Sequence, residues 1–221
     1  MPRSLILSGG GEYRDPWHPF AATSARLAGL LRTLGHRVEV SEGVADRAAD
    51  LSGWDLIVVN AAAGPPADTT AAQAGLLAAQ AGLLAALDRG IGILAVHVGV
   101  TTLLRLPFWE SVTGAAWAPG SMHPKIGPCR ILTYPGRHRI SDRVPDFDIT
   151  DERYSYLRLA SDLVPLAAHE HAGDLHPLLW ARTRGPSRIV ADALGHDERS
   201  YDTPAHCQLI SRAAQWLTQT L

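Results

Sequence analysis

Histidine 97 is the residue whose place in the chain points most directly to chemistry. It ends a continuous apolar run, residues 91–96, that is typical of a buried strand, and the segment after it reads as the start of a helix. Such a sharp strand-to-helix turn puts one side chain at the carboxyl edge of a sheet, where hydrolases and amidotransferases of doubly wound folds carry a Ser or Cys nucleophile. A histidine there removes acyl-enzyme chemistry, so we expect neither an ordinary esterase nor an ordinary amidotransferase.

Other polar side chains follow other predicted strands. Glu12 and His18 follow the first strand, Asn60 follows the third, and His196 follows a late one. Because ligands of doubly wound sheets lie at the carboxyl ends of the strands, we expect these side chains near His97. The helix terminus beside His97 favours a neutral imidazole, which suits a general base, a hydrogen-bond partner or a metal ligand.

Three segments between His97 and His196 add further candidates. His123 precedes a proline, Glu152 and Tyr154 lie in the sequence DERY, and Trp180 follows a His-Pro pair. A carboxylate beside an imidazole can remove and return a proton. Four tryptophans suit either stacking on a sugar or packing in the core, namely Trp17, Trp109, Trp117 and Trp180.

The remaining histidines are predicted to be structural or exposed. His169 and His171 flank Glu170 on one face of a predicted strand, where a metal pair is one interpretation and surface exposure is the favoured one. The loop residues His138 and His176 are expected to be structural or exposed. The last two, His36 and His206, read as an ordinary helix-end residue and an ordinary helix residue.

Composition sets limits on the class of protein. The 221 residues are 46% hydrophobic with a net charge of −2, which fits one domain over residues 1–221 and implies neither a nucleic acid nor an anionic membrane as partner. Cys129 and Cys207 lie outside any CxxC pattern, so we expect no disulfide framework or cysteine zinc site. The first apolar run is too short for a signal peptide, and no window of about 18 uncharged apolar residues is evident, so a cytoplasmic location is expected.

The elements that must position these residues alternate between strands and helices in the first half of the chain. Strands are predicted over residues 4–8, 37–40, 56–59 and 91–96, and helices over 19–34 and 69–87. This alternation favours a parallel sheet with helices on both faces. In the second half, short strands are predicted over 129–134, 156–159, 164–169, 178–182 and 188–193, before a closing helix over 204–217. They indicate additions at one edge of the sheet.

Six motifs, taken in order, carry a resemblance to a known family. They are GIGILAVHVG ending at residue 99, Trp109-Glu110 with Gly114, MHP at 122–124, HRISDRVPDFDITDERY at 138–154, HPLLW at 176–180 and ALGHDERSY at 193–201. Together they resemble the ThuA-like (trehalose-utilisation) family of the class I glutamine amidotransferase-like superfamily. The resemblance extends over most of the chain.

That resemblance implies a fold and a field of activity. The fold is a flavodoxin-like three-layer α/β/α sandwich, with a pocket related in position to the amidotransferase site. The implied activity belongs to sugar catabolism, with 3-keto sugars and their glycosides as suggested substrates, and it favours His123, Glu152 and Tyr154 as site residues. His196 and Glu198 repeat the His-x-Glu of amidotransferases, but without cysteine at position 97 that triad is broken.

The leading hypothesis is an enzyme that acts on a sugar or 3-keto-sugar derivative by His/Glu proton transfer. The predicted catalytic residues are His97, Glu152, His196 and His123, and the predicted substrate-binding residues are Glu12, His18, Asn60, Trp109, Tyr154 and Trp180. A neighbouring imidazole or a divalent metal such as zinc stabilises the enediolate in this mechanism, so the cofactor is left open. Two alternatives stay open: a non-catalytic sugar-binding or regulatory module, and a zinc-dependent hydrolase whose metal is held by His97, His123 and His196. The expected partner is a small carbohydrate, with self-association undecided.

Overall fold

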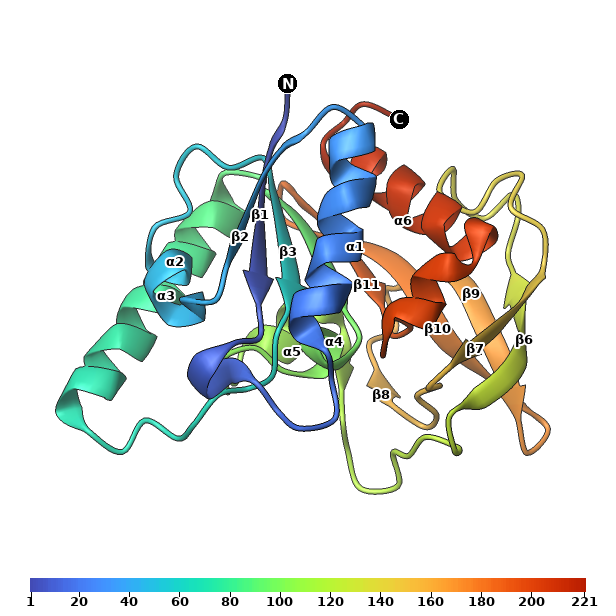
Figure 1. Cartoon of the computed structure of the whole chain (residues 1–221), viewed down its shortest axis with the longest axis horizontal. Helices are drawn as coiled ribbons and strands as arrows, with labels where there is room; N and C mark the ends of the chain where they lie inside the picture. The colour runs from blue at the N-terminus through green and yellow to red at the C-terminus, as the bar shows by residue number, and fades with distance from the viewer.

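A nine-stranded sheet forms the middle layer of the structure, a computed structural model that describes residues 1–221 (Figure 1). The strands are β1 (Arg3–Ser8), β2 (Arg37–Ser41), β3 (Leu56–Asn60), β4 (Gly92–Val96), β6 (Gly127–Thr133), β7 (Phe147–Asp151), β9 (Val164–His171), β10 (Asp174–Arg184) and β11 (Ser187–Asp192). Their order is β2-β1-β3-β4-β11-β10-β9-β6-β7. A separate two-stranded sheet pairs β5 (Ala115–Ala116) with β8 (Arg158–Leu159).

The sheet has a parallel part and an antiparallel extension. Strands β2, β1, β3, β4 and β11 are parallel to one another, in the order typical of flavodoxin-like folds. Strands β10, β9, β6 and β7 continue the sheet through antiparallel pairs, so only β10 and β6 run against the common direction. The predicted α/β sandwich with strands added at one edge is therefore confirmed.

Helices cover both faces of the sheet. They are α1 (Phe20–Thr33), α2 (Val44–Ala49), α3 (Thr70–Asp88), α4 (Val98–Thr101), α5 (Trp109–Thr113) and α6 (Pro204–Leu217), with 3-10 turns η1 (Gly11–Tyr13) and η2 (Glu198–Asp202). Helices α1 and α6 lie side by side on one face, and α2 packs with α3 on the other (Figure 1). The central strands β3 and β4 are buried along their whole length, and their apolar side chains form part of the core between these layers.

The short elements α2, α5 and β5 were not predicted, and two further differences bear on the site. Strand β7 was not expected, because its sequence FDITD carries two aspartates and reads as a loop, although its burial alternates as an edge strand requires. The helix expected after His97 is a single turn, α4, and the chain then takes left-handed backbone conformations at Leu104 and Arg105. Strand β7 matters for function, because it delivers Glu152.

Helix α3 is the one helix whose length and composition would allow it to cross a membrane. This differs from the expectation that no such window exists, because Asp88 is the only charged residue in the helix. Its buried residues, Ala79, Leu83, Ala86 and Leu87, all lie in the second half. A helix that packs on a domain passes the same test of length and composition.

Gly99 allows α4 to lie directly against β3. A Cβ atom at this position would sit 2.5 Å from the carbonyl oxygen of Val59. Gly99→Ala is therefore expected to lower the free energy of unfolding by about 1–3 kcal/mol, measured by urea denaturation. As a control, Gly29→Ala in α1 has nothing within 4 Å, and it should be neutral or stabilising by about 0.5–1 kcal/mol. A Gly99→Ala chain as stable as the Gly29→Ala chain would contradict this packing.

Candidate functional site

His97 lies at a strained turn between β4 and α4. Its backbone has φ 50° and ψ −117°, a conformation that a residue with a Cβ adopts only when the surroundings impose it. The backbone N–H of His97 donates to the carbonyl of Asp192 at the end of β11, over 2.7 Å. The predicted strand-to-helix elbow is therefore present, and it turns the buried imidazole into the site.

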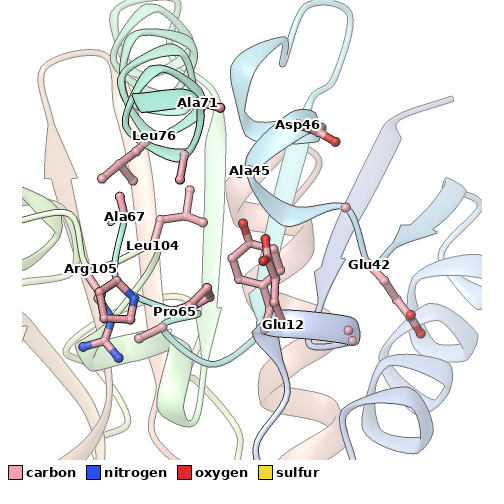
Figure 2. A pocket seen from close by; sticks show the side chains of 18 residues that line it. Glu12, Glu42, Ala45, Asp46, Pro65, Ala67, Ala71, Leu76, Leu104 and Arg105 are labelled. Atoms are coloured by element: carbon pink, nitrogen blue, oxygen red, sulfur yellow. The ribbon is translucent and has the colours of Figure 1, made fainter. Parts of the chain in front are cut away.

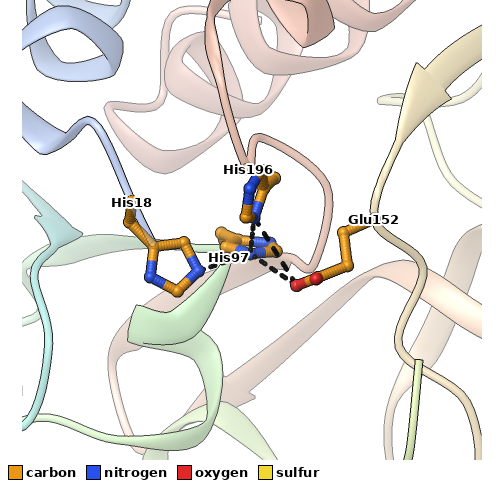
Figure 3. Close-up of side chains that lie close together, drawn as sticks. All are labelled: His18, His97, Glu152 and His196. Carbon is orange, nitrogen blue, oxygen red and sulfur yellow. Dashed lines mark hydrogen bonds and ion pairs between the residues drawn. The ribbon is translucent and has the colours of Figure 1, made fainter. Parts of the chain in front are cut away.

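The Nε2 atom of His97 is the centre of a group of polar side chains. It lies 3.1 Å from Nε2 of His18, 3.2 Å from Oε2 of Glu152 and 3.3 Å from Nδ1 of His196 (Figure 3). One ligand-type atom from each of these four residues lies within 4.8 Å of the other three. The hydroxyl of Tyr154 is 3.2 Å from the same nitrogen. Segments far apart in the chain thus meet at one point.

His123 joins this group from the rim. Its Nδ1 lies 3.0 Å from Oε1 of Glu152, and 44% of its side chain is exposed. Glu152 therefore links the buried imidazole of His97 to the exposed imidazole of His123. The four predicted catalytic residues converge, as the order of the sequence motifs suggested.

The charges of the group follow from these contacts. Burial opposes ionisation of Glu152, but hydrogen bonds from His196 and His97 outweigh it and hold the pKa of that carboxyl well below its usual range. The hydrogen bond to Glu152 raises the pKa of His196. Burial and the neighbouring His97 lower the pKa of His18, although Asp15 opposes this. The site therefore contains an ionised carboxylate beside an imidazole that favours the charged form.

A cavity of about 680 Å³ opens onto the group. Its lining is Pro16, Trp17, His18, Trp117, His123, Glu152, Tyr154 and His196. Trp17 is 72% exposed and Trp117 is 46% exposed, so both indoles present free ring surface at the mouth. Trp117 also packs edge-on against Tyr154, with the ring centroids 5.1 Å apart. The site thus combines ionisable groups at its base with aromatic surface at its rim.

Two tryptophans predicted to bind substrate belong to the core instead. Trp109 and Trp180 are almost completely buried. Their indole N–H groups donate to the carbonyls of Gly99 and Thr113, each over 2.8 Å. The expectation of substrate contact is therefore corrected for both residues.

Asn60 and Glu12 also lie apart from the group. The Asn60 side chain is buried and donates to the hydroxyls of Thr23 and Ser24, each over 2.9 Å, so it fastens β3 to α1 rather than facing a ligand. Glu12 lines a second cavity of about 400 Å³ between α3 and the loops that follow β1 and β2 (Figure 2). Neither residue shares the cavity of His97, so their predicted substrate-binding role is not supported at this site.

His169, which was expected at the surface, is buried, and so are His176, expected to be structural or exposed, and His36, expected to be an ordinary helix-end residue. His169 and His176 face each other across the β9–β10 pair, and strand pairing turns both rings inward. His36 is also buried, with Nδ1 2.7 Å from the hydroxyl of Ser4. The burial of these histidines could not be predicted from local sequence, because it depends on which distant segment covers each strand.

Asp151, which was not predicted as a site residue, connects the backbone segments that carry Glu152 and His196. Its buried carboxylate accepts hydrogen bonds from the backbone N–H groups of Glu152, Gly195 and His196, at 2.7, 2.8 and 3.2 Å, and from the hydroxyl of Ser200 at 2.6 Å. The end of β7 is thereby fixed to the loop after β11. The signal available in the sequence was its place directly before Glu152.

His206 extends this buried network. Its Nε2 lies 2.8 Å from a carboxylate oxygen of Asp192, and its Nδ1 lies 3.1 Å from the carbonyl of Ser200, an atom that can only accept. Burial lowers the pKa of His206, but the charge and hydrogen bond of Asp192 outweigh it and raise the pKa overall. Both nitrogens therefore act as donors, which favours a buried imidazolium behind the site.

The two cysteines lie outside the group. Cys129 is on β6 and Cys207 is on α6, and neither lines the cavity. Burial raises the pKa of Cys129 to about 11 and also raises that of Cys207, so both thiols are held in the unreactive form.

Comparison with solved structures identifies the class of fold. The chain is similar to a glutamine amidotransferase from Thermotoga maritima, with a TM-score of 0.58 and 9% identity over 99% of this chain and 98% of that one. It is also similar to a cytoplasmic protein from Salmonella typhimurium, with a TM-score of 0.62 and 13% identity over 100% and 98% of the two chains. The fold is therefore amidotransferase-like, with histidine at the elbow.

The family follows from a closer match. The chain belongs to the ThuA family, described as trehalose utilisation, whose profile it matches over residues 4–217. A putative ThuA-like protein from Parabacteroides merdae has a TM-score of 0.79 and 16% identity, covering 99% of this chain and 90% of that one. No curated protein matches the chain. Membership of this family supports a role related to trehalose utilisation.

Removing the charge of Asp151 should loosen the site and the domain together. Asp151→Asn replaces an acceptor oxygen by an amide that faces N–H donors, so we expect a loss of about 2–4 kcal/mol in the free energy of unfolding, measured by urea denaturation. Asp148→Asn is the matched control on the same strand, because Asp148 is exposed and forms only a surface pair with Arg130; its effect should stay within about 0.5 kcal/mol. Equal losses of stability in Asp151→Asn and Asp148→Asn would show that the hydrogen bonds of Asp151 do not stabilise the domain.

His169 makes stability depend on pH. Burial lowers its pKa to about 4, whereas the unfolded chain titrates near 6.5. The unfolded state therefore binds more protons in this range, and stability falls as the pH drops from about 6.5 towards 4. His169→Gln should remove up to about 3 kcal/mol of that loss in urea denaturation at a series of pH values. His171→Gln, at a partly exposed neighbour, should leave the pH profile unchanged; a parallel profile for both variants would refute the assignment.

Proposed function

We propose that this chain is an enzyme of carbohydrate catabolism that acts on a sugar or 3-keto-sugar derivative by proton transfer. The observation that carries the proposal is the convergence of an ionised Glu152 and several imidazoles at the base of a cavity rimmed by exposed indoles. Membership of a family described by trehalose utilisation supports the carbohydrate class.

The proposed reaction begins at a carbon next to a ketone, where the C–H bond is acidic. Nδ1 of His123 is occupied by Glu152, so Nε2 is the nitrogen that takes the proton from this carbon. The electron pair moves into the carbonyl and forms an enediolate. Return of the proton to the neighbouring carbon gives an isomerisation. In an elimination, the bond to the glycosidic oxygen breaks instead, and that oxygen accepts the proton as it leaves.

The developing negative charge on the ketone oxygen has two donors near it. His196 favours the charged form because of Glu152. Burial raises the pKa of Tyr154 well above its usual value, so its hydroxyl keeps the proton it can donate. Fixed donors of this kind, set before the substrate arrives, lower the barrier to enolisation.

The indoles at the mouth support a sugar rather than another ketone. Trp17 and Trp117 offer exposed ring surface, which complements the C–H faces of a pyranose. The net charge of −2 fits a neutral small molecule better than a nucleic acid or an anionic membrane surface. A cytoplasmic location is part of the proposal, in line with the Salmonella protein of the same fold.

The test is the exchange and turnover of a 3-keto-disaccharide in D₂O, followed by NMR. The chain should incorporate deuterium next to the ketone and release or isomerise the product. His123→Ala should lower kcat/KM by about 10²–10⁴-fold, the usual contribution of a general base. Trp117→Ala should act mainly on KM, with a loss of about tenfold for a stacking contact of 1–1.5 kcal/mol.

His171→Ala is the control, because this histidine lies outside the cavity. If the chain binds the 3-keto-disaccharide with neither exchange nor turnover, the enzyme proposal fails and a sugar-binding module takes its place. Equal turnover by the His123→Ala and His171→Ala chains would overturn the assignment of the base.

A further inference from the structure

Two imidazole nitrogens face each other at the centre of the site. Nδ1 of His97 lies 3.1 Å from the carbonyl of Ala193, which can only accept, so this nitrogen carries the proton. Nδ1 of His18 lies 2.7 and 2.8 Å from the two carboxylate oxygens of Asp15, so it also carries the proton. When both rings are neutral, their Nε2 atoms present lone pairs to each other across 3.1 Å, and a proton on Nε2 of His97 that bonds to Glu152 makes His97 a cation.

Glu152 and His196 also face Nε2 of His97. Oε2 of Glu152 lies 3.2 Å from Nε2 of His97, and Nδ1 of His196 lies 3.3 Å from it. The proton of His196 and that of the Tyr154 hydroxyl, which lies 3.2 Å from Nε2 of His97, can each bridge only two atoms. A cation that accepts several lone pairs at once would satisfy the whole group.

We propose that His18, His97, His196 and Glu152 bind a divalent transition-metal ion of the zinc type, which deepens the proposed function by supplying its cofactor. Imidazole nitrogens and a carboxylate oxygen are ligands that zinc accepts, and Zn–N bonds of about 2.0–2.1 Å place tetrahedral ligands about 3.3 Å apart. The separations around Nε2 of His97, from 3.1 to 3.3 Å, agree with that spacing. Nδ1 of His196 and Oε2 of Glu152 are 3.6 Å apart, and all four ligand atoms lie within 4.8 Å of one another, so binding of the ion would draw the outer ligands together.

The surroundings orient the ligands as metal sites require. Asp15 on His18 forms the carboxylate–histidine pair that fixes the tautomer of a metal ligand, and the carbonyl of Ala193 does the same for His97. Asp151 holds the backbone at Glu152 and at His196, so one buried carboxylate sets two ligands. Each of the four ligands is thus held by a group that does not itself contact the ion.

This set differs from the ligands expected from the sequence. His123 contacts the other oxygen of Glu152 and is partly exposed, so His18 takes the place that His123 had in the predicted set. His123 is thereby left free to move protons. A bound ion would displace the proton of His196 and would take over its role at the substrate ketone as a Lewis acid.

The metal content of the purified chain tests the proposal independently of enzymatic activity. The full chain is purified without chelator or histidine tag, loaded with Zn²⁺ or Co²⁺, dialysed and analysed for metal. About one ion per chain is expected, and Co²⁺ should give a visible spectrum of nitrogen ligation. His97→Ala and His18→Ala should lose the ion, and Asp15→Asn should weaken its binding about 10–100-fold.

Two controls sharpen the result. His123→Ala should keep the ion if the structural set is correct and lose it if the predicted set is correct. His171→Ala, outside the site, should bind like the parent chain. If His18→Ala fails to fold by circular dichroism, the affinity of Asp15→Asn and the Co²⁺ spectrum of the parent chain still decide.

The outcomes separate the metal from the reaction. Less than about a tenth of an ion per chain after loading, or equal loss in His171→Ala, overturns the metal site. An ion bound with no action on the 3-keto-disaccharide leaves the metal site standing and removes the proposed function. Turnover by a metal-free chain leaves the proposed function standing and removes the role of the ion as its cofactor.

Discussion

The crowding of electron-rich atoms around Nε2 of His97 is the constraint on which the rest of the site depends. His18 and His196 each bring a ring nitrogen, and Glu152 brings a carboxylate oxygen, to within 3.3 Å of that nitrogen. His196 supplies a positive charge beside Glu152, but the Nε2 atoms of His18 and His97 still face each other, and the group would open if its supports were flexible. The buried supports behind each side chain are therefore part of the chemistry.

The fold supplies these supports from both parts of the sheet. The parallel part provides β4, whose end carries His97, and β11, whose last residue accepts a hydrogen bond from it. The antiparallel extension provides β7, which ends directly before Glu152. Because Asp151 bonds to the loop after β11, it connects the far edge of the sheet to its centre. The added strands thus bring the Glu152 carboxylate to an elbow whose imidazoles His18, His97 and His196 come from the parallel part.

The sequence predicted what depends on local pattern. Continuous apolar runs identified β3 and β4, the closing helix α6 was predicted from Pro204, and the order of the motifs indicated that His97, His123, Glu152 and His196 meet. It could not separate Trp117, which is exposed at the cavity, from Trp109, which is buried, because burial is decided by segments distant in the chain. Asp15 was missed for a similar reason, although its place three residues before His18 is a spacing that allows contact.

Anomalous X-ray diffraction from crystals of the metal-loaded chain, recorded on both sides of the zinc absorption edge, tests the central claim most directly. The account predicts one anomalous peak bonded at about 2.0–2.2 Å to Nε2 of His18, Nε2 of His97, Nδ1 of His196 and Oε2 of Glu152, with His123 outside the coordination sphere. A map without a peak there, with the imidazoles of His18 and His97 still in direct contact, would contradict it.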